Sequence, residues 1–248
     1  MIAVIVFLAL ATAINPSRAE GTPGEILQRA DEARGHLKGV AWKVTILSVE
    51  GERQYERTLR VKAKGHNFIA SVLSPPNVKG QRLLMIDHSM WFIKPETTRP
   101  VPISPKQKLM GGAAIGDIAA TDYADGYEAF SLPEESVRGE TCYVFDLKAS
   151  HKKSTYDRIK YWISKERGVA VKAQFFTVSN KLLKTATYEH KNQVHLNGRP
   201  NPFISSMIIS DALIQNRVTT LTFSEPFLVD LPDSTFDLNL LMTGATLD

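Results

Sequence analysis

The stretch from Cys142 to His190 constrains the fold most, because its hydrophobic residues alternate with polar or small ones in successive short runs. An alternation with a period of two indicates β-strands that bury one face. Polar turn sequences separate the runs, and connections this short favour antiparallel pairing, since a parallel crossover needs a dozen or more residues. The alternating positions are Tyr143, Phe145 and Leu147; Ile159, Tyr161 and Ile163; and Val169, Val171 and Phe175.

The chain before and after this stretch predicts further strands with the same pattern. Pro75 and Pro76 interrupt the series, because proline cannot donate to a ladder of hydrogen bonds. The segment 204–214 has mixed periodicity, and we expect a short helix there, preceded by a turn over 197–202. The predicted strands are Val40–Val49, Tyr55–Val61, Phe68–Leu73, Leu83–Ile86, Met90–Ile93, Val101–Ile103 and Val218–Phe223.

One helix is expected near the N-terminus. Thr22, Pro23 and Glu25 supply a capping hydroxyl, a proline for the first turn and a glutamate three residues after the cap. Gly35 marks its end. Together with about ten strands in sequence-adjacent hairpins, this predicts a mainly β fold: one strongly curved antiparallel sheet with helices covering its concave side.

The segment between Lys106 and Tyr127 differs from the strands around it. It is small, hydrophobic and rich in glycine, and a short helix is expected over 117–123. Glycines lower helix stability by roughly 1 kcal/mol each relative to alanine, so the segment suits a movable cover. A plug that sits permanently in the core explains the same composition equally well. The residues predicted for a mobile cover are Leu109, Met110, Gly111, Gly112 and Ile115.

The first nineteen residues predict an export signal. A hydrophobic run ends at Asn15-Pro16, and Ser17-Arg18-Ala19 supplies the small residues that a signal peptidase reads. The run is too short to span a bilayer of roughly 30 Å, which argues against a membrane anchor. We therefore expect a signal peptide over 1–19 with cleavage near Ala19, one domain over 20–248, and a periplasmic location.

No catalytic or metal-binding constellation emerges from the residue order. The net charge of +4 is mild and scattered, so nucleic-acid binding is not predicted. The single Cys142 forms no internal disulfide, and the six histidines lack ligand spacing, so solvated histidines are expected. Asp87-His88-Ser89 is a hairpin turn, and Asp117 stands where a phosphate loop needs its lysine. We predict no enzyme activity, no metal and no cofactor.

Aromatic residues on the predicted inner face remain as the candidate binding surface. A curved sheet with a small cover leaves room for a hydrophobic cavity, although an ordinary core explains the same residues. Trp162 has the opposite parity and is expected on the outer face, with Arg158, Lys160 and Lys172. The residues predicted to bind lipid are Trp42, Trp91, Tyr143, Phe145, Tyr161 and Phe175.

The chain resembles the outer-membrane lipoprotein-sorting proteins, the relatives of LolA. The resemblance covers nearly the whole chain after residue 19, and its most specific part is Tyr156-Asp157-Arg158-Ile159-Lys160-Tyr161-Trp162-Ile163. The order and spacing of weaker motifs support it. These motifs are Ile26-x4-Asp31-x2-Arg34-Gly35, Pro76-x3-Gly80 before Leu83-Leu84, Trp91-Phe92-Ile93-Lys94-Pro95 with Arg99 beyond, Leu109-Met110-Gly111-Gly112, Thr121-Asp122-Tyr123, Gly139-Glu140-Thr141-Cys142-Tyr143, and Lys172-Ala173-Gln174-Phe175-Phe176 with Lys184.

This resemblance implies a half-open antiparallel β-barrel of about eleven strands with helices at its mouth. It also implies a periplasmic, monomeric carrier that binds lipoprotein acyl chains or another lipid in a hydrophobic cavity. Such a carrier would move its cargo toward the outer membrane, with an inner-membrane transporter and an outer-membrane acceptor as partners. The alternative is a sensor or adaptor similar to RseB, which binds a protein partner in envelope signalling.

Overall fold

The computed structural model describes residues 21–95, 97 and 99–243. The predicted signal peptide lies outside these described residues. Within them, no helix is both long and hydrophobic enough to cross a membrane.

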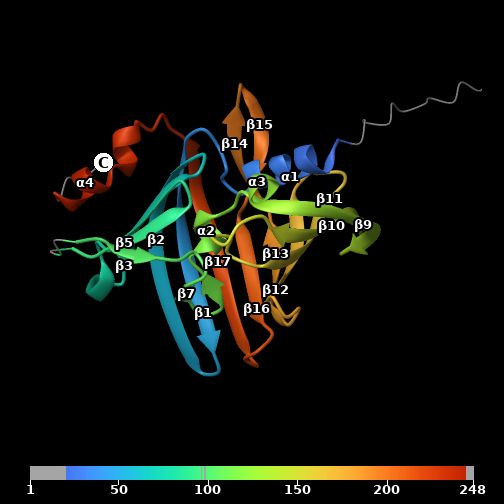
Figure 1. Ribbon diagram of the computed structural model, residues 1–248, viewed down its shortest axis with the longest axis horizontal. Coiled ribbons are helices and arrows are strands. Elements are labelled where there is room, and N and C mark those ends of the chain that lie inside the picture. The colour runs from blue at the N-terminus through green and yellow to red at the C-terminus, as the bar shows by residue number, and fades with distance from the viewer. Residues whose placement is uncertain (1–20, 96, 98, 244–248) are drawn as a thin grey trace, which may run out of the picture.

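A single large antiparallel sheet dominates the molecule (Figure 1). Its thirteen strands follow the order β6-β5-β4-β3-β2-β1-β17-β16-β13-β12-β11-β10-β9, so β1 and β17 join an N-terminal half to a C-terminal half. The strands are β1 Val40–Glu50, β2 Arg53–Lys64, β3 Asn67–Ser74, β4 Arg82–Ile86, β5 Ser89–Ile93, β6 Val101–Ile103, β9 Tyr127–Val137, β10 Glu140–Ala149, β11 Arg158–Ser164, β12 Ala170–Phe176, β13 Leu182–Glu189, β16 Ser206–Asp211 and β17 Arg217–Leu228.

The two outermost strands, β6 and β9, do not pair with each other, so the sheet stays open. This confirms the mainly β, open antiparallel architecture, whereas the predicted count of about eleven strands was wrong. Two short ribbons stand apart from the sheet: β7 Lys108–Met110 with β8 Ala113–Ala114, and β14 Asn192–Leu196 with β15 Arg199–Phe203. The turn of the second ribbon, Asn197-Gly198, has positive φ at both residues, as tight hairpins require.

The helices are few and short. Helix α1 spans Pro23–Glu32 and begins with the predicted capping box, in which Thr22 and Glu25 exchange backbone-to-side-chain hydrogen bonds of 2.8 and 3.3 Å. Helices α2 (Gly116–Ala119) and α3 (Tyr123–Gly126) replace the single helix expected over 117–123. At the C-terminal end, a 3₁₀ turn (Asp233–Phe236) leads into α4 (Leu238–Met242).

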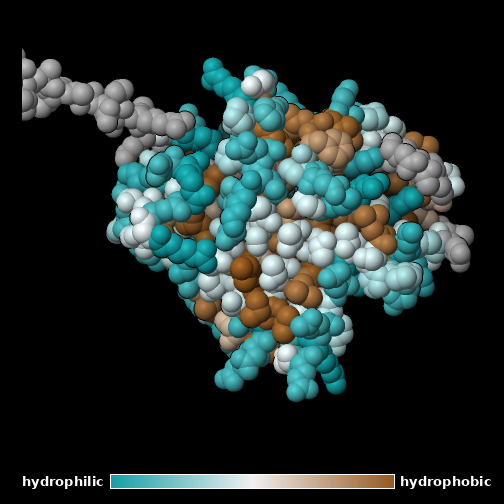
Figure 2. All heavy atoms as spheres, turned by 180° about the vertical axis from the view of Figure 1, so that it is seen from behind, coloured by the Kyte–Doolittle hydropathy of each residue, from teal (hydrophilic) through white to brown (hydrophobic). Residues whose placement is uncertain are grey.

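The sheet buries hydrophobic residues on both faces. We call the face beneath α1, α2, α3 and the β7–β8 ribbon the inner face; it carries the main core. On the outer face, the C-terminal segment 229–242 packs on β3–β5, with Leu231, Phe236 and Leu241 against Ile69 and Leu84. Figure 2 shows the molecule from behind, where hydrophobic residues form patches interleaved with hydrophilic ones.

Two sequence predictions about strands were wrong for identifiable reasons. The segment 204–214 contains strand β16 instead of a helix: Met207 and Ile209 are buried while Ile208 between them is exposed, which is a period of two. A β-bulge between Trp162 and Ile163 shifts the register of β12, so Val171 joins Cys142 on the outer face. Strand β9 was not predicted at all.

Candidate functional site

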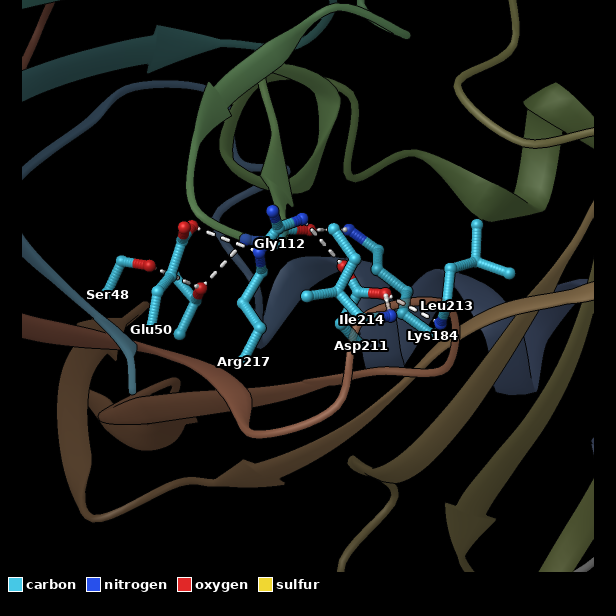
Figure 3. A network of polar contacts seen from close by, with 9 residues as sticks. Ser48, Glu50, Gly112, Lys184, Asp211, Leu213, Ile214 and Arg217 are labelled. Atoms are coloured by element: carbon cyan, nitrogen blue, oxygen red, sulfur yellow. Dashed lines mark hydrogen bonds and ion pairs between the residues drawn. The ribbon is translucent and has the colours of Figure 1, made fainter. Parts of the chain in front are cut away.

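The inner face is closed by a segment that we call the cover, residues 108–126, which contains β7, β8, α2 and α3. Its centre is tied to the sheet by polar contacts (Figure 3). The backbone N–H of Gly112 donates to Thr219 Oγ1 on β17 at 2.8 Å, and Lys184 Nζ on β13 donates to the Gly112 carbonyl at 3.0 Å. The cover is therefore attached to two different strands at one glycine.

Lys184 also forms a buried ion pair with Asp117 of α2. The N–O distance is 2.5 Å, and the two side chains are 6% and 0% exposed. Asp117 further accepts hydrogen bonds from the Tyr156 hydroxyl at 2.7 Å and from the Ala114 backbone N–H at 2.8 Å. Three donors thus surround one buried carboxylate, which fixes α2 against the sheet.

The outer part of the same network joins β1, β16 and β17. Arg217 forms ion pairs of 3.0 Å with Glu50 and with Asp211, and Asp211 accepts the backbone N–H groups of Leu213 and Ile214 (Figure 3). These contacts tie together the ends of three central strands next to the point where the cover is attached.

The glycines of the cover let its backbone lie close to neighbouring residues. Gly111 has a φ of +56°, and a Cβ there would overlap Ser48 Oγ and Thr219 Oγ1. A Cβ on Gly116 would overlap Thr155, whereas one on Gly126 in α3 would meet no atom within 4 Å. The glycine richness of the cover therefore reflects how tightly its backbone lies on the neighbouring elements.

We expect Gly116→Ala to destabilise the protein by about 1–3 kcal/mol through overpacking against Thr155. Gly126→Ala is the matched control in the same segment and should be neutral or slightly stabilising, because the methyl group has open space and alanine favours helix. Urea unfolding of both variants measures the difference. Equal effects of the two substitutions would contradict the close packing of Gly116.

A second attachment joins the cover to α1. Asp31 Oδ2 accepts the backbone N–H groups of Tyr123 and Ala124 at 2.7 and 2.8 Å, so its carboxylate holds the first turn of α3. One turn on, the guanidinium of Arg34 lies over the rings of Tyr123 and Tyr188, 4.6 and 5.4 Å from their centroids. Both Asp31 and Arg34 are buried, so the contact excludes water.

Burial sets the protonation behaviour of these groups. It raises the pKa of Asp31 well above the usual value, while the Ala124 N–H and the charge of Arg34 act in the opposite direction. Burial likewise raises the pKa of Tyr123 and Tyr188, so both remain neutral phenols over the physiological range. Arg34 thus contacts neutral aromatic faces, an arrangement worth about 2 kcal/mol when water is excluded.

We expect His190, at the end of β13, to make the stability of the fold sensitive to acid. Burial, followed by the charges of Arg167 and Arg34, lowers its pKa to about 3, and neither ring nitrogen has a hydrogen-bond partner among the described residues. The unfolded chain takes up this proton near pH 6.5, so stability should fall as pH drops from about 6.5 toward 3, by up to about 1.4 kcal/mol per unit. His190→Phe should flatten that slope in urea titrations between pH 7 and pH 4.5.

His195→Gln is the control for this titration, because His195 is an exposed histidine on the neighbouring β14. It should keep the wild-type slope. If His190→Phe showed the same loss of stability per pH unit as the wild type, burial of a neutral His190 could not be the cause.

Two cavities flank the cover and the sheet. One of about 240 Å³ lies on the inner face at the edge of the cover, with basic residues Arg57, Arg82 and Lys108 at its rim. Its hydrophobic lining is Leu59, Val72, Leu83, Phe92, Ile103, Leu109 and Ile115. The other, of about 910 Å³, lies between the outer face of β1–β3 and the segment 229–242. Its lining mixes Ile69, Leu73, Phe227 and Leu231 with Lys43, Arg60, Lys62, Lys79 and Arg82.

Four histidines that are far apart in the sequence, His36, His66, His88 and His151, lie in one row in the fold. The ring centroids of His36 and His66 are 5.2 Å apart, those of His66 and His88 4.9 Å, and those of His88 and His151 5.0 Å. Burial, then His66 and His151, lower the pKa of His88. All four keep some exposure, as expected of solvated histidines, but the sequence did not predict that they lie together, because the fold joins segments that are far apart in the sequence.

Solved structures of known proteins share this fold. A crystal structure of a LolA superfamily protein from Nitrosomonas europaea is 30% identical, with a TM-score of 0.80 over 89% of this chain and 99% of that chain. The chain belongs to the LolA superfamily. A family described only as an uncharacterized protein matches residues 64–243. No curated protein sequence matches the chain.

Two more distant members of the LolA fold share the architecture. One is a putative outer membrane lipoprotein-sorting protein domain from Vibrio parahaemolyticus, 19% identical with a TM-score of 0.75 over 88% of this chain and 97% of that chain. The other is a DUF1329 family protein from Desulfovibrio piger, 19% identical with a TM-score of 0.74 over the same shares. At this identity they show the fold alone.

Within this LolA-superfamily fold, the residues predicted to bind lipid do not form one surface. Phe145, Tyr161 and Phe175 are buried in the inner core, and Tyr143 is half-buried beside it. Trp42 is buried in the same core and also borders the outer cavity. Trp91 instead packs on the outer face against the C-terminal segment.

The sequence-predicted cover residues are found together. Leu109 and Ile115 line the inner cavity, and Gly111 and Gly112 contact β1 and β17. Sequence reasoning did not identify the polar residues that hold the cover, namely Asp31, Asp117 and Lys184. Buried charges leave no periodic signal, although Asp31, Arg34 and Lys184 are among the residues on which the sequence resemblance to the LolA-like proteins rests.

Proposed function

We propose that this protein is an exported, periplasmic lipid carrier that binds the acyl chains of a lipoprotein or another lipid between the inner face and the cover. The observation that carries the proposal is the hydrophobic inner cavity at the cover's edge, lined by Leu83 and Ile103 of the sheet and Leu109 and Ile115 of the cover. The polar contacts that hold the cover lie at Gly112, Asp117 and α3, in the same segment as Leu109 and Ile115.

The energies allow a bound acyl chain to replace the polar contacts that hold the cover on the sheet. Separating the buried ion pair costs at most about 3–5 kcal/mol, the cost of removing one partner, because an opened cover returns both charges to water. Burying an acyl chain returns about 0.8 kcal/mol per methylene group, so about five methylenes offset the loss of the Lys184–Asp117 contact. An acyl chain that is longer than this would hold the cover open, and release would let the cover close again.

The outer cavity is the competing location for a lipid, so the experiment separates the two. Ile103→Trp, at a half-buried position of β6, narrows the inner cavity, and Ser71→Trp narrows the outer cavity on β3. Binding of a fluorescent fatty acid is measured for the wild type and both variants, and lipids that co-purify are identified by mass spectrometry. We expect Ile103→Trp to weaken binding of the probe and Ser71→Trp to leave it unchanged.

Each outcome decides a different part of the proposal. Loss of binding in Ser71→Trp alone would move the lipid to the outer face. Absence of both co-purified lipid and probe binding in the wild type would reject lipid carriage altogether. Recovery of a membrane protein in place of lipid would favour a sensor or adaptor. For a carrier, an inner-membrane transporter and an outer-membrane acceptor are the partners that we propose.

A further inference from the structure

The acidic end of the histidine row brings three potential metal ligands together. His36 follows α1, His66 lies in the β2–β3 turn, and Asp122 is the N-cap of α3 in the cover. One ligand atom from each residue lies within 4.8 Å of those from the other two. They line a cleft of about 30 Å³, which is the space of a single water molecule or ion.

The Asp122 carboxylate has one oxygen, Oδ2, that is available to a further ligand. Its Oδ1 accepts the backbone N–H of Asp125 at 3.2 Å, which caps α3. Its Oδ2 is buried and accepts no hydrogen bond from a described residue, and the side chain is 9% exposed. His66 Nδ1 lies 3.0 Å from this oxygen without the geometry of a hydrogen bond.

The spacing of these atoms suits a tetrahedral ion after small movements. Bonds of about 2.0–2.1 Å place neighbouring ligands of a tetrahedral zinc ion about 3.3 Å apart. The observed separations, from 3.0 Å between His66 and Asp122 up to 4.8 Å, bracket that value. The His66 and His36 rings are half-buried side chains on turns, so they have room to adjust.

We propose that His36, His66 and Asp122 bind a divalent transition-metal ion of the zinc class. Imidazole nitrogens with one carboxylate favour zinc or its neighbours over magnesium and calcium, which prefer oxygen ligands. Three protein ligands leave the fourth position for water. Asp125 Oδ2, 4.0 Å from His66 Nε2, supplies a carboxylate to orient the imidazole.

The opposite end of the row is the poorer site. Lys153, held by the Ser89 hydroxyl at 2.9 Å, lines the same cleft and repels a cation. At the acidic end, a bound ion would connect the loop after α1, the β2–β3 turn and the cover. It would therefore fasten the cover to the sheet at a third point, beside Asp31.

The test uses untagged, chelator-treated protein and zinc ion alone. Isothermal titration measures the binding, and the melting temperature with and without zinc measures its effect on the fold. We expect one site, and binding at least tenfold weaker in His66→Gln and Asp122→Asn. Asparagine is as good a helix cap as aspartate, so Asp122→Asn should keep the metal-free melting temperature. His195→Gln, an exposed histidine outside the row, is the control and should bind as the wild type does.

Three results would overturn the proposal. The first is no saturable one-site binding by the wild type, which would leave His66 and Asp122 as an ordinary ion pair. The second is unchanged affinity in both Asp122→Asn and His66→Gln. The third is an equal loss in His195→Gln, which marks nonspecific binding by surface imidazoles. A rise in melting temperature that zinc produces in the wild type and not in Asp122→Asn would support it independently of the titration.

Discussion

Replacing Lys184 with methionine is expected to lower the free energy of unfolding by about 3–5 kcal/mol. The substitution keeps most of the volume of the side chain but leaves the Asp117 carboxylate, which is fully buried, without its counter-charge. It also removes the donor to the Gly112 carbonyl. Urea unfolding followed by intrinsic fluorescence measures the loss.

Lys181→Met supplies the control, because Lys181 immediately precedes β13 and is exposed. It should change stability little. The double variant Lys184→Met/Asp117→Asn should recover part of the loss, because the neutral amide can still accept from Tyr156 or Ala114. If the two single losses simply add in the double variant, the ion pair does not hold the cover as we describe.

The sheet could be predicted from sequence where its strands bury one face. Val40–Glu50 alternates over most of its length, as does the second half of Arg53–Lys64, and the turn between them carries Gly51. Strand β9 was not predicted from the sequence, because it is an edge strand that contains Pro133 and is largely exposed and acidic. Strand β16 was masked by hydrophobic residues on both parities, and one of them, Ile208, is exposed.

The site was predicted less well, because its contacts join residues that are far apart in sequence. Lys184 and Asp117 are 67 residues apart, and Asp31 and Tyr123 are 92 apart. No local pattern brings such pairs together, and the register shift in β12 shows that even the parity rule fails at a bulge. Composition distinguished the segment as either a movable cover or a permanent plug, and the structure places two of its glycines, Gly111 and Gly116, where the backbone packs closely.

The cover is therefore held at two separate points that share a design. Each point consists of one buried carboxylate with several donors, Asp117 on the cover facing Lys184 of the sheet and Asp31 on α1 facing the cover's backbone. Buried charges of this kind contribute little net stability but are costly to leave unpaired. Contacts like these favour one closed arrangement while allowing a competing ligand to replace it as a whole.

Replacing Asp31 with alanine is expected to destabilise the protein by about 2–5 kcal/mol, because two buried backbone donors lose their acceptor at about 1–3 kcal/mol each. Asp31→Asn should cost less, since its amide oxygen can still accept from Tyr123 and Ala124. Glu32→Ala, one position along α1 and partly exposed, is the control.

Hydrogen exchange locates the effect of Asp31→Ala. The amides of Tyr123 and Ala124 should lose protection first, ahead of the central strands β1 and β17, because they are the groups that Asp31 holds. A uniform loss of protection across the sheet would show that Asp31 stabilises the whole fold and does not act on the cover. A loss confined to the cover, with tighter binding of the fatty-acid probe, would connect this carboxylate to opening, because a weaker closed state lowers the cost of admitting an acyl chain.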